Sequence, residues 1–317
     1  MNCDIEVMAR PLRNSDPSFF RHIIMRTDEA RLWMVPSREM EELLGGIVAR
    51  YQEILGIEIF AYCFLTNHFH LLIRAPRSNT DEFMENVNRE IARRVNWLNK
   101  RQGKFWGRPY EDKQVPREVD IVAVLLYITT NCVHHGLVHS SSKWPGLSSY
   151  EQCFSLEPRK FCFHHHSAGE GEEKETHHFL KLTSIPEFSF LNPLERAEKL
   201  KLLIEEKTTR IIIERKEKGS HGFFGVQAVK AQKPGEIPHD VAHSSRASGY
   251  SKCPETLREH RLQKRERTSQ YRHASMRFRL GDMMVEFPPH SYKPPLHRKP
   301  RLFHFTPLTV AHLQFAS

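Results

Sequence analysis

The sequence predicts an α+β fold, and three observations within the first half of its 317 residues predict it. Two runs rich in branched and aromatic residues, 58–65 and 68–74, are separated by only two residues and are typical of paired strands. Apolar residues recur at three- and four-residue steps in 38–55 and in 81–98, as in amphipathic helices. An extended stretch at 19–25 precedes both helices. This order predicts a ferredoxin-like split βαβ domain, an antiparallel sheet with helices on one face.

Further elements complete this domain. The apolar positions of its two helices are Met40, Leu43, Leu44, Ile47, Tyr51 and Leu55 in the first and Phe83, Val87, Ile91 and Val95 in the second. A short strand is expected near 106–115, and another helix from about 117 to 132. We therefore assign 1–150 to one compact domain.

The rest of the chain is less regular. Residues 151–192 include the polar stretch FCFHHHSAGEGEEKETHH and are predicted to be a linker. A helix is expected at 193–218, opened by Asn192 with Pro193 at its first position. Residues 219–317 have little periodicity and much Ser, Arg, Lys and Pro, which predicts a basic, partly disordered extension.

The charge of the chain is regional. Its 47 Lys and Arg against 38 Asp and Glu give a net charge of +9, which favours an anionic partner. Residues 244–302 hold 14 basic and 5 acidic side chains and account for the whole excess, whereas the first 150 residues are close to neutral. The basicity therefore describes the extension and not the compact domain.

Composition excludes several protein classes. The longest apolar run, 121–128, is too short to cross a membrane, and no charged-then-apolar leader opens the sequence, so we expect a soluble, cytoplasmic protein. Six cysteines without a CxxC pair indicate neither a zinc knuckle nor a disulfide framework. Reduced, structural thiols are the preferred interpretation.

The stretch AYCFLTNHFHLLIRA, residues 61–75, is the most informative for chemistry. On a strand, His68 and His70 point to the same face while Phe69 points to the other. Two neutral imidazoles on one face are suited to holding a divalent ion. The alternative is a pair of hydrogen-bonded surface histidines, since the chain holds 20 histidines and such pairs arise by chance.

Five segments in order resemble one family. They are MARPLR at 8–13, TNHFHLLI at 66–73, GKFWGRPY at 103–110, YITTNCVHHGLV at 127–138 and SKWPGLSSY at 142–150. Together they resemble the IS200-like single-tyrosine transposases of the HUH endonucleases, especially the REP-associated tyrosine transposases. The resemblance covers about the first 150 residues.

The resemblance implies a metal-dependent nuclease or transposase that cleaves and rejoins single-stranded DNA near hairpin-forming repeats, in the cytoplasm and at the nucleoid. It implies that His68 and His70 hold Mg²⁺ or Mn²⁺ and that Tyr110 is the nucleophile. A phenolate is a fair leaving group, so a 5′-phosphotyrosine intermediate can be reversed. A Tyr taken alone is more often a packing or turn residue. Relatives of this kind act as monomers or as homodimers.

A third metal ligand is usual in the family, and Gln114 lies four residues after Tyr110. Asp112 and Glu111 are competitors, and a solvated glutamine is an open alternative. The family's Asn-Pro-Val appears here as Asn131, Cys132 and Val133, which we interpret as a change in helix packing.

Two further features lie at the start of the chain and in its basic extension. Because MARPLR commonly begins the relatives, Met8 is a candidate for the true first residue. The basic extension interleaves cations with Tyr271, Phe278 and Tyr292, which could stack on unpaired bases. Its predicted phosphate-binding residues are Arg261, Lys264, Arg265, Arg267, Arg272, Arg277 and Arg279. A merely solvated basic tail is the alternative.

The histidines of the predicted linker are not expected to form a physiological metal site, because no Cys or strand scaffold accompanies them. They are His164, His165, His166, His177 and His178. Two other functions stay open for the whole chain. One is a non-catalytic nucleic-acid-binding protein that retains the fold, and the other is a metal-dependent hydrolase of small phosphoesters.

Overall fold

The computed structural model describes residues 12–116, 118–165, 174–220, 222–238 and 249–293. The chain divides into two compact units, and each is considered by itself. The larger unit comprises residues 14–263 and contains the sheet domain. Of the described residues, the smaller contains 12, 13 and 264–293. Met8, the alternative start, lies outside the described residues.

The larger unit contains the predicted split βαβ domain. Its elements are β1 (Phe20–Arg26), α1 (Arg38–Leu55), β2 (Glu58–Phe64), β3 (His68–Arg74), α2 (Thr80–Leu98) and β4 (Glu111–Val115). The four strands form one sheet in the order β2, β3, β1, β4, with every neighbouring pair antiparallel. This is the ferredoxin-like arrangement, so the predicted fold class is confirmed.

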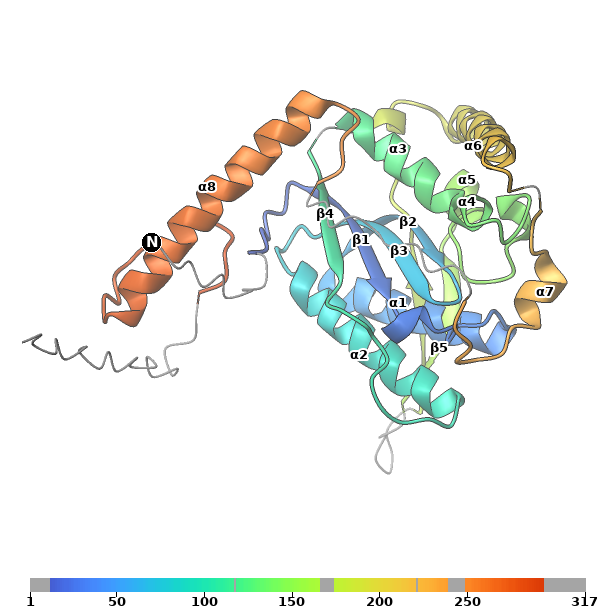
Figure 1. Ribbon diagram of the computed structural model, residues 1–317, viewed down its shortest axis with the longest axis horizontal. Coiled ribbons are helices and arrows are strands. Elements are labelled where there is room, and N and C mark those ends of the chain that lie inside the picture. The colour runs from blue at the N-terminus through green and yellow to red at the C-terminus, as the bar shows by residue number, and fades with distance from the viewer. Residues whose placement is uncertain (1–11, 117, 166–173, 221, 239–248, 294–317) are drawn as a thin grey trace, which may run out of the picture. The chain divides into compact units, whose positions relative to one another are not determined.

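Helices α1 and α2 cover one face of this sheet (Figure 1). Ile23 of β1 and Phe69 of β3 point into this core, where α1 contributes Ile47 and α2 contributes Phe83. Ser37 caps α1 by accepting a hydrogen bond from the backbone N–H of Met40, at 3.0 Å. The predicted helix ranges and the observed ones therefore agree closely, because the apolar spacing and the caps point to the same boundaries.

The opposite face of the sheet is also covered, by α3 (Glu118–Thr129), α4 (Asn131–His134) and α6 (Pro193–Glu217). Phe20, Phe60 and Leu72 of the sheet form a second core there with Val124 of α3 and Leu200 of α6. The sequence predicts helices on one face, and the structure adds a second layer. Since β2 and β3 are buried on both faces, each face has a cover. Side chains on the α3 face are consequently buried.

Residues 151–192, predicted to be a linker, are instead structured where they are described. They form α5 (Gln152–Ser155), the hairpin of β5 (Arg159–His164) and β6 (Glu175–Leu180), and a short turn η3 (Pro186–Phe188). Phe161, Phe163 and Leu180 are buried in the core beside α1. The linker prediction is wrong because Phe161 and Phe163 alternate along β5 and pack inward together with Leu180 of β6.

The C-terminal part contains more helix than predicted. Helix α6 begins as expected at Asn192, whose side chain and that of Glu195 form a capping box. Two helices follow, α7 (Val226–Lys230) and α8 (Pro254–Arg279), in the extension predicted to be partly disordered. The remaining short elements are the 3₁₀ turns η1 (Asp28–Ala30) and η2 (Ser141–Lys143). Among the helices that the structure describes, none has the length and apolar character that crossing a membrane requires.

Candidate active site

Three histidines meet on the α3 face of the sheet. His68 and His70 project from β3 with their ring centroids 5.0 Å apart, as the alternation of strand side chains predicts. His22 projects from the neighbouring strand β1, and its Nε2 lies 2.9 Å from Nδ1 of His70. All three side chains are almost completely buried, with relative exposures of 2 to 4%. The predicted pair is therefore part of a larger cluster.

Hydrogen bonds fix which nitrogen of each ring is available. The side-chain amide of Asn67 donates from Nδ2 to the carbonyl oxygen of Ala30, at 2.9 Å, so its Oδ1 faces the Nδ1 of His68, at 2.6 Å. Nδ1–H of His68 therefore donates, and Nε2 carries the free lone pair. Nδ1 of His70 is likewise engaged, with His22. Nε2 of His68 is thus available to a ligand, and Nε2 of His70 is available in the tautomer in which Nδ1–H of His70 donates to His22.

Burial keeps the cluster neutral. Desolvation, with a smaller contribution from Lys113, lowers the pKa of His22 to about 3. The pKa values of His68 and His70 also lie well below the usual range, chiefly because of burial and then because of neighbouring cationic and imidazole groups. Nε2 of His70 is buried and has no hydrogen-bond partner among the described residues. A neutral, unpartnered imidazole nitrogen in this position fits a divalent cation.

Helix α3 and the turn after it close the other side of the cluster. The ring of Tyr127 lies 5.4 Å from that of His70 and 5.7 Å from that of His22, measured between centroids. His135, which follows α4, lies 5.1 Å from His68. Burial raises the pKa of Tyr127, while the Asn131 amide beside it and the charge of Arg26 oppose that rise. A tyrosine hydroxyl is thus placed among the potential metal ligands.

Two cations border the same cluster. Arg26 of β1 pairs in register with His68, and Lys113 of β4 pairs with His22, so both side chains share the α3 face. Their positive charges contribute to the low pKa values of the histidines, Arg26 at His68 and Lys113 at His70. Nζ of Lys113 lies 3.3 Å from a carboxylate oxygen of Glu111. Neutral imidazoles bordered by cations form a site suited to an anion such as a phosphodiester.

Comparison with known proteins shows which family this region is similar to. Residues 18–131 match the family model described as "Transposase IS200 like". One similar solved structure is described as "Structure of the REP associates tyrosine transposase bound to a REP hairpin". It is 16% identical, covers 45% of this chain and 82% of the other, and superposes with a TM-score of 0.38. None of the curated protein sequences matches this chain.

Within the sheet domain, Tyr110 lies on the other face of the sheet from His68 and His70. It directly precedes β4, packs against the core of α1 and α2, and donates a hydrogen bond from its hydroxyl to Asp81 of α2. Alternation along β4 explains this placement, because Lys113 faces the histidines and residues at odd separations from it face away. The structure therefore does not bring the predicted nucleophile to the predicted metal ligands.

Gln114 is separated from the histidine pair in the same way. It pairs in register with Arg21, and its side-chain amide lies 3.4 Å from the carbonyl oxygen of Asn14. Asp112, a competing candidate ligand, forms an ion pair with Arg21 on that face, at 2.6 Å. Glu111 shares the face of the histidines but pairs in register with Ile24, and its carboxylate contacts Lys113. The segment 110–114 thus divides between the two faces of the sheet.

Tyr127, Asn131, His22 and His135 were not recognised from the sequence. One signal was present, because Tyr127 and Asn131 are four residues apart within YITTNCVHHGLV, a spacing that places two side chains on one helix face. His22 becomes recognisable only through the pairing of β1 with β3, which puts its ring next to His70. These contacts join residues that are distant in sequence.

The predicted phosphate-binding residues all lie on α8. Arg261, Arg265, Arg272 and Arg279 are exposed. Arg267 donates a hydrogen bond to the carbonyl oxygen of Pro289, and Arg277 forms an ion pair with Asp282 at 2.5 Å. Tyr271 and Phe278 both pack against Phe287, with centroid distances of 5.4 and 5.8 Å. Two of the three predicted stacking aromatics are therefore engaged within the chain.

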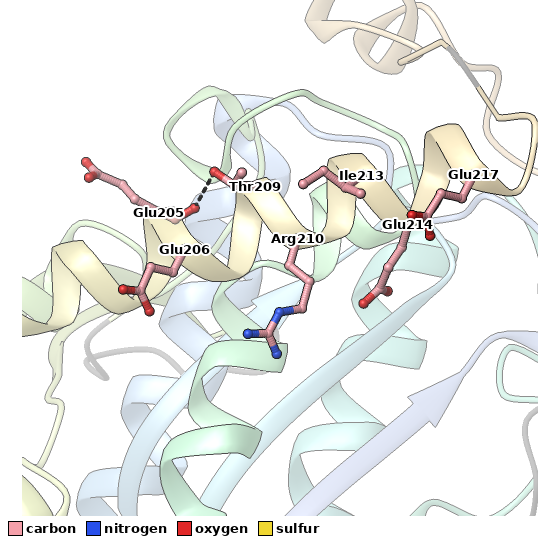
Figure 2. Close-up of a pocket in the computed structure, with 7 residues that line it drawn as sticks. All are labelled: Glu205, Glu206, Thr209, Arg210, Ile213, Glu214 and Glu217. Atoms are coloured by element: carbon pink, nitrogen blue, oxygen red, sulfur yellow. Dashed lines mark hydrogen bonds between the residues drawn. The ribbon is translucent and has the colours of Figure 1, made fainter.

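A hollow on the surface of α6 is chemically different from the histidine cluster (Figure 2). Four glutamates line it, together with Thr209, Arg210 and Ile213. The glutamates are Glu205, Glu206, Glu214 and Glu217. Because four carboxylates repel a phosphodiester, this hollow does not compete with the histidine cluster as a site for nucleic-acid chemistry.

Proposed function

We propose that the transposase domain cleaves and rejoins single-stranded DNA with Tyr127 as the nucleophile. The observation that carries this proposal is the packing of Tyr127 against His70 and His22, on the face opposite to Tyr110. A nucleophile must lie within reach of the group that activates the phosphodiester. Tyr127 meets this requirement within the described cluster, and Tyr110 does not.

In this proposal Nε2 of His68 and Nε2 of His70 hold a divalent ion, Mg²⁺ or Mn²⁺. When bound, such an ion polarises the phosphoryl oxygens and stabilises negative charge in the transition state. Asn131 is completely buried beside Tyr127, and its amide oxygen is the kind of hard donor that these ions prefer. We therefore propose Asn131 in place of Gln114 as the third donor.

Side chains of the domain carry out the remaining steps. Burial keeps the Tyr127 phenol protonated at rest, so its proton must pass to water as the oxygen attacks phosphorus, and Arg26 and Asn131 favour that loss. Attack forms the tyrosine O–P bond and breaks the bond from phosphorus to the 3′ oxygen, which takes up one proton from water and becomes a 3′-hydroxyl. The reverse attack by that hydroxyl expels the tyrosine oxygen and rejoins the strand. Arg26 and Lys113 bind the phosphate charge throughout.

We propose hairpin-forming single-stranded DNA as the substrate. The similar solved protein is bound to a REP hairpin, and the exposed arginines of α8 offer contacts to a nucleic-acid backbone in this chain. Phosphate contacts of this kind add affinity without reading sequence.

The test is incubation of full-length protein with hairpin-bearing single strands and Mg²⁺ or Mn²⁺, followed by denaturing electrophoresis. Wild-type protein should form a covalent adduct, Tyr127→Phe should form none, and Tyr110→Phe should retain most of it. Because both tyrosines are partly buried and lose only a hydroxyl, each substitution is a matched control for the other. Binding of the DNA by wild type without any adduct would instead favour a non-catalytic nucleic-acid-binding protein.

A further inference from the structure

The outer face of the β5–β6 hairpin gathers soft and hard metal donors. Cys162 and His164 are two residues apart on β5 and therefore share a face. Their direct partners across the hairpin are His177 and Glu175 of β6. Four side chains capable of binding a metal thus lie in two adjacent cross-strand pairs. None of them belongs to the histidine cluster beside Tyr127.

Three of these donors already lie close together. One ligand atom from each of Cys162, His164 and Glu175 lies within 4.8 Å of the other two, and Nδ1 of His164 is 3.0 Å from a carboxylate oxygen of Glu175. Tetrahedral zinc holds neighbouring ligand atoms about 3.3 to 3.8 Å apart, given its bond lengths to sulfur and nitrogen. Small side-chain rotations are enough to reach this geometry. His164 and Glu175 are exposed and Cys162 is partly exposed, so an ion can enter from solvent.

The backbone beneath these donors is anchored to α1. The carboxylate of Glu42 accepts a hydrogen bond from the backbone N–H of Cys162, at 2.6 Å. Gly46 of α1 approaches the carbonyl oxygen of Cys162 so closely that a Cβ there would lie 2.3 Å from it. On the inner side, Phe161 and Phe163 are buried. The two β5 donors therefore project from a fixed strand, and metal binding requires little ordering of the chain.

The other histidines of this hairpin have separate partners. His178 faces inward, where Nδ1 lies 2.8 Å from a carboxylate oxygen of Glu53 and Nε2 lies 2.9 Å from the hydroxyl of Thr176. His165 contacts the same hydroxyl, at 3.0 Å. None of these contacts involves the four donors on the outer face. The sequence alone predicts no metal site here because it reveals neither the strand scaffold nor the alignment of Cys162 with the histidines.

We propose that this face binds one zinc ion through Cys162, His164 and Glu175, with His177 as the fourth ligand. Thiolate and imidazole donors select zinc over Mg²⁺, which prefers an all-oxygen shell. The ion joins β5 to β6 across an otherwise solvent-facing hairpin surface. It is a structural site, because four protein ligands leave no open position for a substrate.

Cobalt substitution tests this site without interference from the other histidine cluster. Metal-free, reduced full-length protein is titrated with Co²⁺, and thiolate-to-cobalt charge transfer is followed in the near ultraviolet. The wild type should reach one equivalent of the thiolate signal, and His68→Ala should keep it, because that cluster contains no thiol. Cys162→Ser should abolish the signal, whereas Cys253→Ser, the matched control at another partly exposed cysteine, should retain it.

Zinc affinity supplies a second measurement that does not depend on the cysteine variant folding. Glu175→Gln changes one exposed side chain and should weaken zinc binding by at least about tenfold, the lower range seen even for loss of a supporting contact. Its metal-free circular dichroism spectrum should match the wild type. A wild-type protein without the charge-transfer signal, an equal signal in Cys162→Ser, or unchanged zinc affinity in Glu175→Gln would each overturn the proposal. None of these results would bear on the nuclease, which uses other residues.

Discussion

The polar side chains on the two faces of the same sheet differ in kind and in their partners. On the face of α1 and α2, Arg21 forms an ion pair with Asp112 and Tyr110 donates to Asp81. On the face of α3, Nε2 of His70 is buried without a partner among the described residues. Leaving a buried polar atom unpaired costs about 1 to 3 kcal/mol, so an unpaired atom indicates a ligand more strongly than a satisfied one does. Buried atoms without a partner among the described residues also occur on the α1 and α2 face, Nε of Arg21 among them, so the two faces differ chiefly in the kind of polar group: an ion pair on one and neutral imidazoles on the other.

The largest effect is expected from removing a proposed metal ligand on the α3 face. His70→Ala should slow adduct formation by at least about a thousandfold, since a metal ion supplies several kcal/mol of transition-state stabilisation. Gln114→Ala, on the opposite face, should change the rate by less than about threefold, because its side chain does not reach the cluster. Single-turnover cleavage of hairpin-bearing DNA at saturating Mn²⁺ measures both. Equal losses in the two variants would contradict the division between the faces.

The next largest effect is expected on the free energy of unfolding, from a substitution on the face of α1 and α2. Asp112→Ala removes the partner of Arg21, whose side chain is 1% exposed, and leaves that charge buried. Breaking such a pair costs about 3 to 5 kcal/mol. Urea unfolding of the metal-free protein should show this loss, while the Co²⁺ or Mn²⁺ affinity of the remaining folded protein stays within about threefold of wild type. A large loss of metal affinity would show that this face also supports the site.

A smaller effect is expected in the pH dependence of the free energy of unfolding. Buried His22 has a pKa of about 3, so it stays neutral in the folded protein between pH 7.5 and 5, whereas the unfolded chain takes up a proton near pH 6.5. The unfolded state then binds more protons, and stability falls as pH decreases below about 6.5. The expected loss for this histidine is about 2 kcal/mol at pH 5.

Urea unfolding in EDTA at the two pH values measures this loss. The variant His22→Gln lacks the titrating group and should show a drop about 2 kcal/mol smaller than wild type does. Identical pH dependence in the two proteins would show that His22 is not held neutral by the fold.

The sequence predicted the sheet domain well because its signals are local. Apolar spacing and capping residues define α1, α2 and α6, and alternation along 68–74 correctly placed His68 and His70 on one face. The polar hairpin of β5 and β6 was missed, since Phe161 and Phe163 are inward residues within a composition typical of linkers.

The assignment of the nucleophile required information that is not local. Tyr110 and Lys113 belong to one short segment, and only the pairing of β4 with β1 shows which of them faces His22. Tyr127 lies within an apolar helix, and its spacing to Asn131 does not reveal its contact with His70, because the packing of α3 across the sheet creates that contact. Long-range packing therefore decides which tyrosine lies beside the proposed metal ligands.

The central claim is that Tyr127 carries the DNA after cleavage. The most direct measurement is mass spectrometry of the trapped covalent adduct after digestion of both protein and DNA. We expect the nucleotide mass on the peptide containing Tyr127 and an unmodified peptide containing Tyr110. A nucleotide on Tyr110 would rule out Tyr127 as the nucleophile.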